Sequence, residues 1–212
     1  MLGITSFWLF LITGIILNIT PGTDTIYIMS RSISQGKLAG VYSVLGVSTG
    51  VLVHTMLAAF GLSIILTQSV LLFTAIKLIG AAYLIYLGIR MLWQKGSALS
   101  KEIPTKEHLS FRKIYMQGVM SNVLNPKVAL FFISLLPQFV ATDNPYGPIP
   151  FLILGLTISI TGTVWCLFIA YFSSFATTKL RENPKIESMM NKLTGIVFIG
   201  LGISLMKTKS AS

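Results

Sequence analysis

The sequence is poor in charged side chains. Asp, Glu, Lys and Arg make up only 10% of its 212 residues, whereas soluble domains carry about a quarter. This shortage excludes an ordinary soluble protein and indicates an integral membrane protein. Acidic residues are the scarcest: six stand against sixteen Lys and Arg, for a net charge of +10. In a soluble protein such an excess would suggest a nucleic-acid partner. Here most basic residues lie between apolar segments, so we expect no nucleic-acid partner.

Other absences narrow the chemistry. Cys166 is the only cysteine and there are two histidines, so an internal disulfide is impossible and a soft-metal site is poorly supplied. No glycine-rich phosphate loop ends in Gly-Lys-Ser/Thr, which disfavours nucleotide binding. We therefore predict no cofactor, no bound metal and no catalytic residues.

Long apolar segments are what the sequence does contain. Hydrophobic residues make up 53% of the chain and the mean hydropathy is +0.79. A helix needs roughly 20 apolar residues to cross a bilayer, and no alternating strand pattern of a membrane barrel is present. The sequence therefore predicts an all-α integral membrane fold without a soluble domain. The six predicted transmembrane helices are 4–29, 39–66, 70–93, 114–140, 148–172 and 189–206.

The two halves of the chain break their first apolar segment in the same way. Each has a glycine, an asparagine four residues later, a proline within four more, and a charged residue beyond it. In the first half these are Gly14, Asn18, Pro21 and Asp24. In the second half they are Gly118, Asn122, Pro126 and Lys127. Paired interruptions of this kind are typical of the substrate sites of membrane transporters.

Weaker similarities continue downstream in the same order. Residues 45–48 match 154–157, 77–80 match 192–195, and 87–89 match 201–203. We therefore predict one membrane domain, 1–212, made of two three-helix repeats with broken first and fourth helices. The first repeat is about 1–93, a polar basic loop covers about 94–112, and the second repeat is about 113–212.

The distribution of Lys and Arg predicts the orientation. Basic residues lie in the first, third and fifth loops, whereas the second and fourth loops carry none. The positive-inside rule then places the odd-numbered loops in the cytoplasm and both termini outside. Three helices per repeat make the two repeats insert in opposite senses, which is an inverted-repeat design.

Asp24 is the only acidic residue within the predicted spans, and a carboxylate at membrane depth costs at least ~2.5 kcal/mol. The span boundaries place it toward the cytoplasmic end of the first helix. One interpretation is structural: Thr23 or Asp24 caps a helix that restarts after Pro21-Gly22. The other is functional: the carboxylate exchanges protons or holds a substrate ammonium group.

The second break offers complementary groups. Lys127 is expected to hold a substrate carboxylate, to pair with Asp24, or to extend toward an interface. Pro21 and Pro126 each free an upstream carbonyl, and we expect the amides of Asn18, Asn122 and Asn125 to satisfy them. Gly22 would let the broken backbone bend. His54, in the second predicted helix, is either hydrogen-bonded to a neighbouring helix or part of a proton relay.

These motifs resemble those of the LysE/RhtB family of amino-acid exporters. Residues 18–24 are similar to its Pro-Gly-Pro-Asp signature, and residues 122–127 to its Asn-Pro-Lys signature. Segments 45–54 and 77–88 resemble its second and third helices, so the similarity covers nearly the whole chain. One departure is Thr23, which stands where the signature has its second proline.

The resemblance implies a bacterial inner-membrane exporter of amino acids or close derivatives, exchanging them for protons by alternating access. It implies that Asp24, Asn122, Asn125 and Lys127 line the pathway. The absence of a second acid in the spans favours a neutral or homoserine/threonine-like substrate. Rivals are a divalent metal cation exporter on the same scaffold and, ranked lower, an intramembrane enzyme. Glycine steps such as Gly46 to Gly50 favour close helix packing, either internal or in a homo-oligomer within the lipid bilayer.

Overall fold

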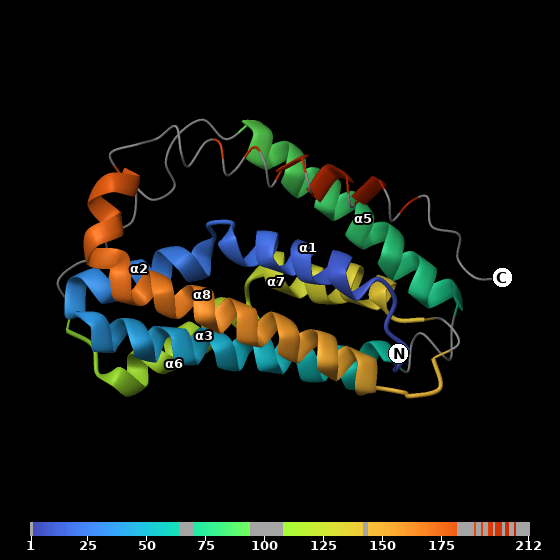
Figure 1. Ribbon diagram of the computed structural model, residues 1–212, viewed down its shortest axis with the longest axis horizontal. Helices are drawn as coiled ribbons and strands as arrows, with labels where there is room; N and C mark the ends of the chain where they lie inside the picture. The colour runs from blue at the N-terminus through green and yellow to red at the C-terminus, as the bar shows by residue number, and fades with distance from the viewer. Residues whose placement is uncertain are drawn as a thin grey trace.

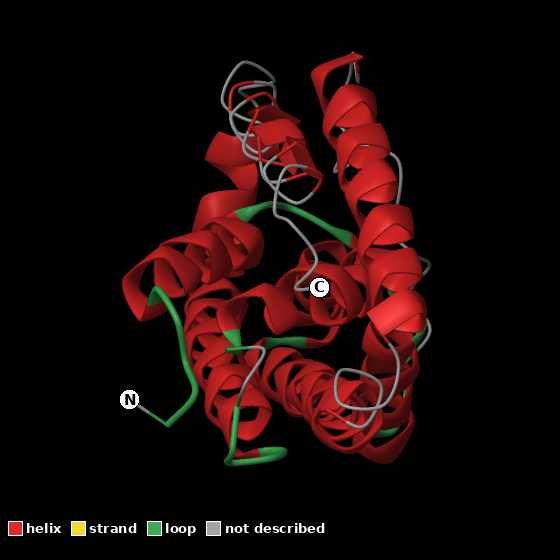
Figure 2. Cartoon of the chain, turned by 90° about the vertical axis from the view of Figure 1, so that its right-hand side faces the viewer, coloured by secondary structure: helices red, strands yellow, loops and turns green. Residues whose placement is uncertain are grey.

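The described part of the chain is helical. A computed structural model describes residues 2–63, 70–93, 108–141 and 144–181, with scattered residues between 189 and 206. Figure 2 shows helices joined by loops, without strands in the described residues. The one extended pairing there is an isolated antiparallel bridge between Ile4 and Val140. The prediction of an all-α fold is confirmed for these residues.

The first broken segment consists of α1 (Phe7–Ile19) and α2 (Thr23–Gln35), which meet at an angle of 48°. Thr20, Pro21 and Gly22 separate the two helices, because Pro21 has no N–H to continue the helical ladder. After α2 the chain turns at Gly36, whose φ of +88° lies in a region that favours glycine.

The second broken segment consists of α6 (Phe111–Val123) and the consecutive short helices α7 (Pro126–Leu130), η3 (Phe131–Leu135) and η4 (Leu136–Phe139). Its two parts meet at 45°. The predicted interruptions of the helix at Pro21 and at Pro126 are therefore confirmed.

Two unbroken helices complete the central group. The first is α3 (Lys37–Leu57) with its π-helical continuation η1 (Ala58–Leu62), and the second is α8 (Ile149–Arg181). Residues 37–62 and 149–173 are long and apolar enough to cross a membrane, so the described residues contain two candidate spans, or four if each bent pair counts as one.

The third predicted helix packs on one side of this group, where it contacts η3. The predicted helix 70–93 coincides with α5 (Val70–Trp93), which runs along one side of the molecule in Figure 1. Most of the predicted loop 94–112 lies outside the described residues, as does part of the predicted helix 189–206, whose described residues are helical. Where the structure describes it, Gly195 faces Gly88 of α5 closely enough that an added Cβ would lie 2.7 Å from the Gly88 carbonyl oxygen.

The boundaries predicted for the first helix were wrong, and the error matters for the site. The helical segment begins at Phe7 and continues to Gln35 instead of ending at 29. The predicted helix ends too early because α2 is amphipathic and carries polar residues such as Arg31. Asp24 is the second residue of α2, so it lies near the middle of the broken segment and not toward one end of it.

The predicted close approach of helices at glycines is realised between α3 and α6, which pack more extensively than any other pair of described elements. A Cβ added to Gly46 would lie 2.2 Å from the Tyr115 carbonyl oxygen, and one added to Gly118 would lie 2.8 Å from the Ser43 carbonyl oxygen. The backbones of the two helices touch at this point, so a side chain on either one requires them to separate.

This contact gives a stability prediction. We expect Gly46→Ala to lower the free energy of unfolding by about 1–3 kcal/mol, as overpacking of a tight contact does. The measurement is the melting temperature of the purified protein in detergent. Gly61→Ala is the matched control, since its Cβ would meet nothing within 4 Å. Equal melting temperatures for the two variants would contradict the close packing of α3 against α6.

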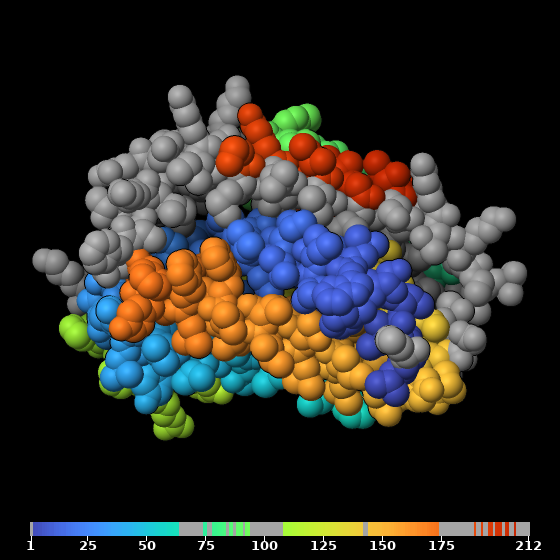
Figure 3. Space-filling view, viewed as in Figure 1, coloured from blue at the N-terminus to red at the C-terminus, as the bar shows by residue number. Residues whose placement is uncertain are grey.

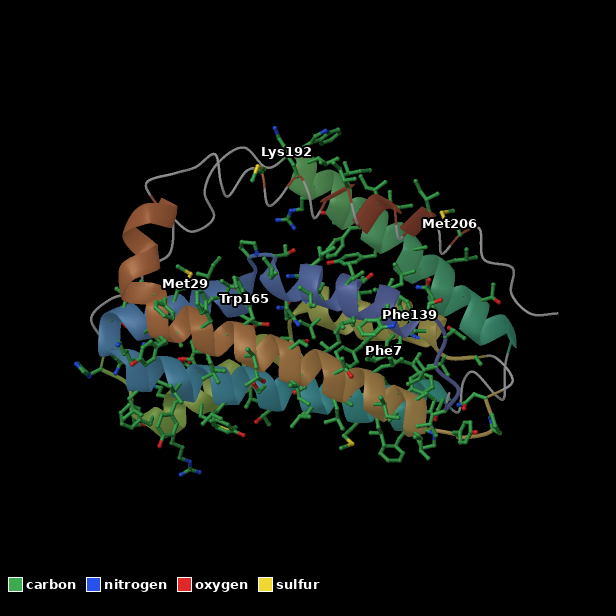
Figure 4. The ribbon with its side chains drawn as sticks, in the orientation of Figure 1. Phe7, Met29, Phe139, Trp165, Lys192 and Met206 are labelled. Carbon is green, nitrogen blue, oxygen red and sulfur yellow. The ribbon has the colours of Figure 1, made fainter. Side chains whose placement is uncertain are left out.

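Two apolar clusters occupy opposite ends of the helix group. The larger includes Phe10, Phe131, Phe139 and Phe151, and the smaller consists of Ile28, Val44, Val47 and Ala170. Figure 4 shows Phe139 toward the same end as the start of α1, and Met29 toward the other end. The two breaks lie between these clusters.

The basic residues gather at one end. Figure 1 shows the α2–α3 turn, the start of α6 and the end of α8 together at that end. Arg31 donates to Gln35 Oε1 and Gln117 Oε1, each at 3.2 Å, and the Lys37 ammonium lies 3.9 Å from the centre of the Tyr171 ring. The described parts of the three odd-numbered loops thus share one end of the molecule.

Candidate functional site

At the first break, Lys127 replaces the donor that Pro21 lacks. The N–H of residue 21 would have bonded the Leu17 carbonyl in a continuous helix. Lys127 Nζ instead donates to Leu17 O at 2.8 Å and to Thr20 O at 2.9 Å. The end of α1 is therefore satisfied by a charged side chain from the second half of the chain, and the expectation that asparagine amides do this was wrong.

At the second break, His54 has the corresponding role. Pro126 frees the Asn122 carbonyl, which accepts from the Asn125 N–H at 2.9 Å and lies 3.2 Å from His54 Nε2. Because a carbonyl can only accept, His54 Nε2 carries the hydrogen. The ring is buried and stacks on Phe132 with centroids 5.6 Å apart. This is the hydrogen-bonded arrangement that the sequence offered as one of two interpretations of His54.

Asp24 reaches across to the second break. Its Oδ1 accepts from Ser121 Oγ at 3.1 Å, and its Oδ2 accepts from Asn122 Nδ2 at 2.8 Å and Asn125 Nδ2 at 3.0 Å. Each half of the chain thus binds the charged group of the other half. The Asp24 carboxylate of the first half is bound at the second break, and the Lys127 ammonium of the second half is bound at the first break.

Two structural interpretations of these charges are wrong. Asp24 and Thr23 do not cap α2, because its N-cap is Gly22 and no side chain caps it. Asn125 is the capping residue here, with its Oδ1 accepting from the Lys127 N–H at 3.0 Å at the start of α7. Asp24 and Lys127, both among the described residues, also form no ion pair with each other. The hydrogen-bond partners of each charged group are neutral.

The exchanged charges line a small cavity of about 60 Å³. Polar groups from both breaks face it, and apolar residues of both clusters close it, among them Val47, Phe132 and Ile158. A cavity of this size holds a few waters or small polar groups, and it is well below the roughly 150 Å³ that admits benzene. The cavity is therefore too small for an amino acid in this conformation, in which α1 and α8 pack against one another on the face drawn in Figure 3.

Comparison with known proteins agrees with the family that the two break motifs resemble. The model of the family described as LysE type translocator matches residues 15–209. The chain belongs to this family. It is a membrane transport protein, and the resemblance seen in the two break motifs is confirmed. No solved structure matches.

Relatives of this LysE type translocator span nearly its full length. The uncharacterized membrane protein YrhP of Bacillus subtilis is 35% identical over 87% of this chain and 90% of its own. An uncharacterized membrane protein of Vibrio cholerae is 33% identical over 96% and 98%. The leucine efflux protein of Salmonella typhimurium is 26% identical over 98% of each chain.

The structure brings most of the predicted site residues together in the translocator. Cavity-lining members of the predicted set are Asn18, Gly22, Asp24, Asn122, Asn125 and Lys127. Pro21 and Pro126 form the breaks but do not line the cavity. Thr23 is exposed at the first position of α2 and also lies outside the lining. His54 does not line the cavity, and it contacts the site through the Asn122 carbonyl and the ring of Phe132.

Sequence reasoning missed three residues that shape the site. Ser121 donates to Asp24, and two glycines make room for asparagines. A Cβ on Gly50 would lie 2.6 Å from Asn122 Cβ, and one on Gly162 would lie 3.0 Å from Asn18 Oδ1. The sequence marks Gly50 as a packing glycine, but only the fold shows that it packs against a site residue.

Proposed function

We propose that this translocator exports amino acids, with neutral ones favoured, in exchange for protons. The observation that carries the proposal is the exchange of partners between the two breaks around a small polar cavity. The names of the Salmonella leucine efflux proteins support an amino-acid cargo. Transport, not a chemical reaction on the substrate, is the proposed activity.

The cavity offers acceptors for an ammonium group. Asp24 contributes a carboxylate, and the end of α1 contributes two carbonyls at the negative end of a helix dipole. Asn122 is 1% exposed, and its Oδ1 has no hydrogen-bond partner among the described residues. This oxygen is covered by Gly50 of α3, whose added Cβ would lie 2.7 Å from it, so the acceptors open to the cavity are those of Asp24 and α1.

The cavity also offers one cation for a carboxylate. Among the described residues, Lys127 is the only Lys or Arg that lines it. One acid and one base suit the two charged ends of an amino acid and leave no further charge for the side chain. Apolar Val47, Val51 and Ile158 complete the lining, with the hydroxyls of Ser48 and Thr163 2.7 Å apart. A neutral, aliphatic or hydroxyl-bearing side chain fits this composition best, once the cavity widens.

Alternating access gives the apolar clusters a function as gates. The larger cluster would close the side on which α1 begins, and the smaller one the basic side. In the proposed arrangement, two inverted three-helix repeats, about 1–93 and 113–212, cross the bacterial inner membrane six times. The basic end then faces the cytoplasm, both termini face outward, and the 94–112 loop joins the repeats.

Asp24 would couple the binding of a proton to the movement of one repeat against the other. Proton uptake by this carboxylate weakens its bonds to Ser121, Asn122 and Asn125, because neutral hydrogen bonds are weaker than charge-assisted ones. Those bonds join the two repeats. Protonation would therefore loosen the contact between the breaks and allow one repeat to move against the other.

The first test is efflux from preloaded cells that express the translocator. Cells would be loaded with a panel of neutral, acidic and basic amino acids, and efflux would be compared with that of cells without the protein. We expect faster efflux of neutral amino acids, at least about tenfold over the control, which corresponds to roughly 1.4 kcal/mol of barrier. Zn²⁺ and Cd²⁺ would be assayed in parallel. Metal efflux without amino-acid efflux, by a protein present in the membrane, would overturn the proposal.

A further inference from the structure

The ammonium group of Lys127 occupies a place that suits the ammonium of a ligand. It donates to the Leu17 and Thr20 carbonyls, and Leu17 O is free because Pro21 has no N–H. These carbonyls lie at the C-terminal end of α1, where the partial negative charge favours a cation. Both residues line the cavity, so an ammonium group bound here would lie in it.

We propose that this pair of carbonyls is the ammonium site of the translocator, and that Lys127 is a tethered competitor which the amino group of the substrate displaces. The inference rests on the proposed function, since it assigns the two ends of an amino acid to particular atoms. Once displaced, the Lys127 ammonium pairs with the carboxylate of the same ligand. An amino acid thus replaces one satisfied contact by another and leaves no buried charge unpaired.

This exchange selects for ligands that carry both charges. A ligand with only an ammonium group can displace Lys127 but leaves its charge buried without a partner, which is costly. A ligand with only a carboxylate has no group to replace Lys127 at the carbonyls. A tethered competitor acts at an effective concentration in the millimolar range or above, so it also weakens the binding of every ammonium ligand.

The cavity carries its own reporter. Cys166 is the only cysteine of the chain and lines the same cavity as Lys127. Cys166 is partly exposed, so N-ethylmaleimide can alkylate it in the purified protein when the cavity widens, and a ligand in the cavity slows the reaction. The shift in melting temperature with each probe is measured in parallel, because a thiol in a narrow cavity reacts slowly. The probes are L-leucine, L-leucinamide, which lacks the carboxylate, and 4-methylpentanoate, which lacks the ammonium group. The concentration that halves the alkylation rate measures the apparent affinity of each probe.

The proteins compared are wild type, Lys127→Met, Lys127→Gln and Lys127→Arg. Methionine fills the space without a charge, whereas glutamine keeps a neutral donor for the carbonyls and so protects the fold. Arginine is the matched control that keeps a tethered cation. Monodisperse elution and a cooperative melting transition identify the folded variants.

We expect leucinamide to protect Cys166 at a concentration at least about tenfold lower in Lys127→Met than in wild type, because the internal competitor is gone. Lys127→Gln should shift in the same direction, Lys127→Arg should show no gain, and 4-methylpentanoate should protect neither neutral variant. Equal leucinamide concentrations in wild type and in the folded neutral variants would overturn the proposal. If wild type fails to respond to leucine while Lys127→Met gains affinity for leucinamide, the ammonium site stands and the leucine cargo of the proposed function fails.

Discussion

Asp24→Asn should lower gradient-driven export by about 100-fold or more while leaving the protein folded. Asparagine has the shape of aspartate, so its oxygen can accept from Asn122 and Asn125 while its amide faces the Ser121 hydroxyl. The fold is preserved, but the charge and the capacity to bind a proton are lost. A hydrogen bond to a charged group contributes about 1.5–3 kcal/mol, and two factors of ten in rate correspond to about 2.7 kcal/mol. Export of the best amino acid from the efflux panel, with and without a proton gradient, is the measurement.

Ser121→Ala is the control for this variant. It removes one of the three hydrogen bonds to the carboxylate and keeps the charge, so export should fall by less than about tenfold. If Asp24→Asn exports like wild type with the same dependence on the gradient, Asp24 only tethers the two breaks, and proton coupling must reside elsewhere.

Gly50→Ala should lower export by about tenfold or more through Asn122. The added methyl group would lie 2.6 Å from Asn122 Cβ and 2.7 Å from Asn122 Oδ1, so the asparagine must move. Movement breaks or lengthens its 2.8 Å bond to Asp24. Overpacking of this kind costs about 1–3 kcal/mol, which should also appear as a lower melting temperature. Export rate and melting temperature are measured on the same preparation.

A double-mutant cycle separates this effect from general damage. In an Asn122→Gly background the methyl group of Gly50→Ala meets neither the amide nor a Cβ, so adding it should change export and melting temperature little. Gly61→Ala, in an open position on the continuation of α3, should behave like wild type. A further loss of export or of melting temperature from Gly50→Ala that persists in the Asn122→Gly background would show that Gly50 acts through something other than Asn122.

The positions of the two breaks were predictable from the sequence because proline has one dominant local effect. Pro21 and Pro126 remove a helix donor wherever they stand, and the helices end next to both of them. Family membership was predictable for the same reason, since the residues around the breaks form compact motifs. The family model then matched residues 15–209.

The partners of the break residues could not be predicted, because they depend on how the halves pack. One interpretation of the sequence paired Asp24 with Lys127, whereas in the fold Asp24 accepts hydrogen bonds from Asn122 and Asn125. Lys127 donates to the backbone carbonyls of Leu17 and Thr20, and no pattern of side chains in the sequence predicts these bonds. The length of α2 was also missed, because an amphipathic helix inside a bundle does not have the apolar composition that marks a span.

The measurement that tests the central claim most directly is proton movement during amino-acid transport in reconstituted vesicles. A pH dye is enclosed in the vesicles and the best amino acid from the efflux panel is added outside, with no preset pH gradient. The account predicts that wild type changes the internal pH when the amino acid is added, and that Asp24→Asn and protein-free vesicles do not. Amino-acid transport by wild type without any pH change would contradict the exchange of amino acid for proton at the two breaks.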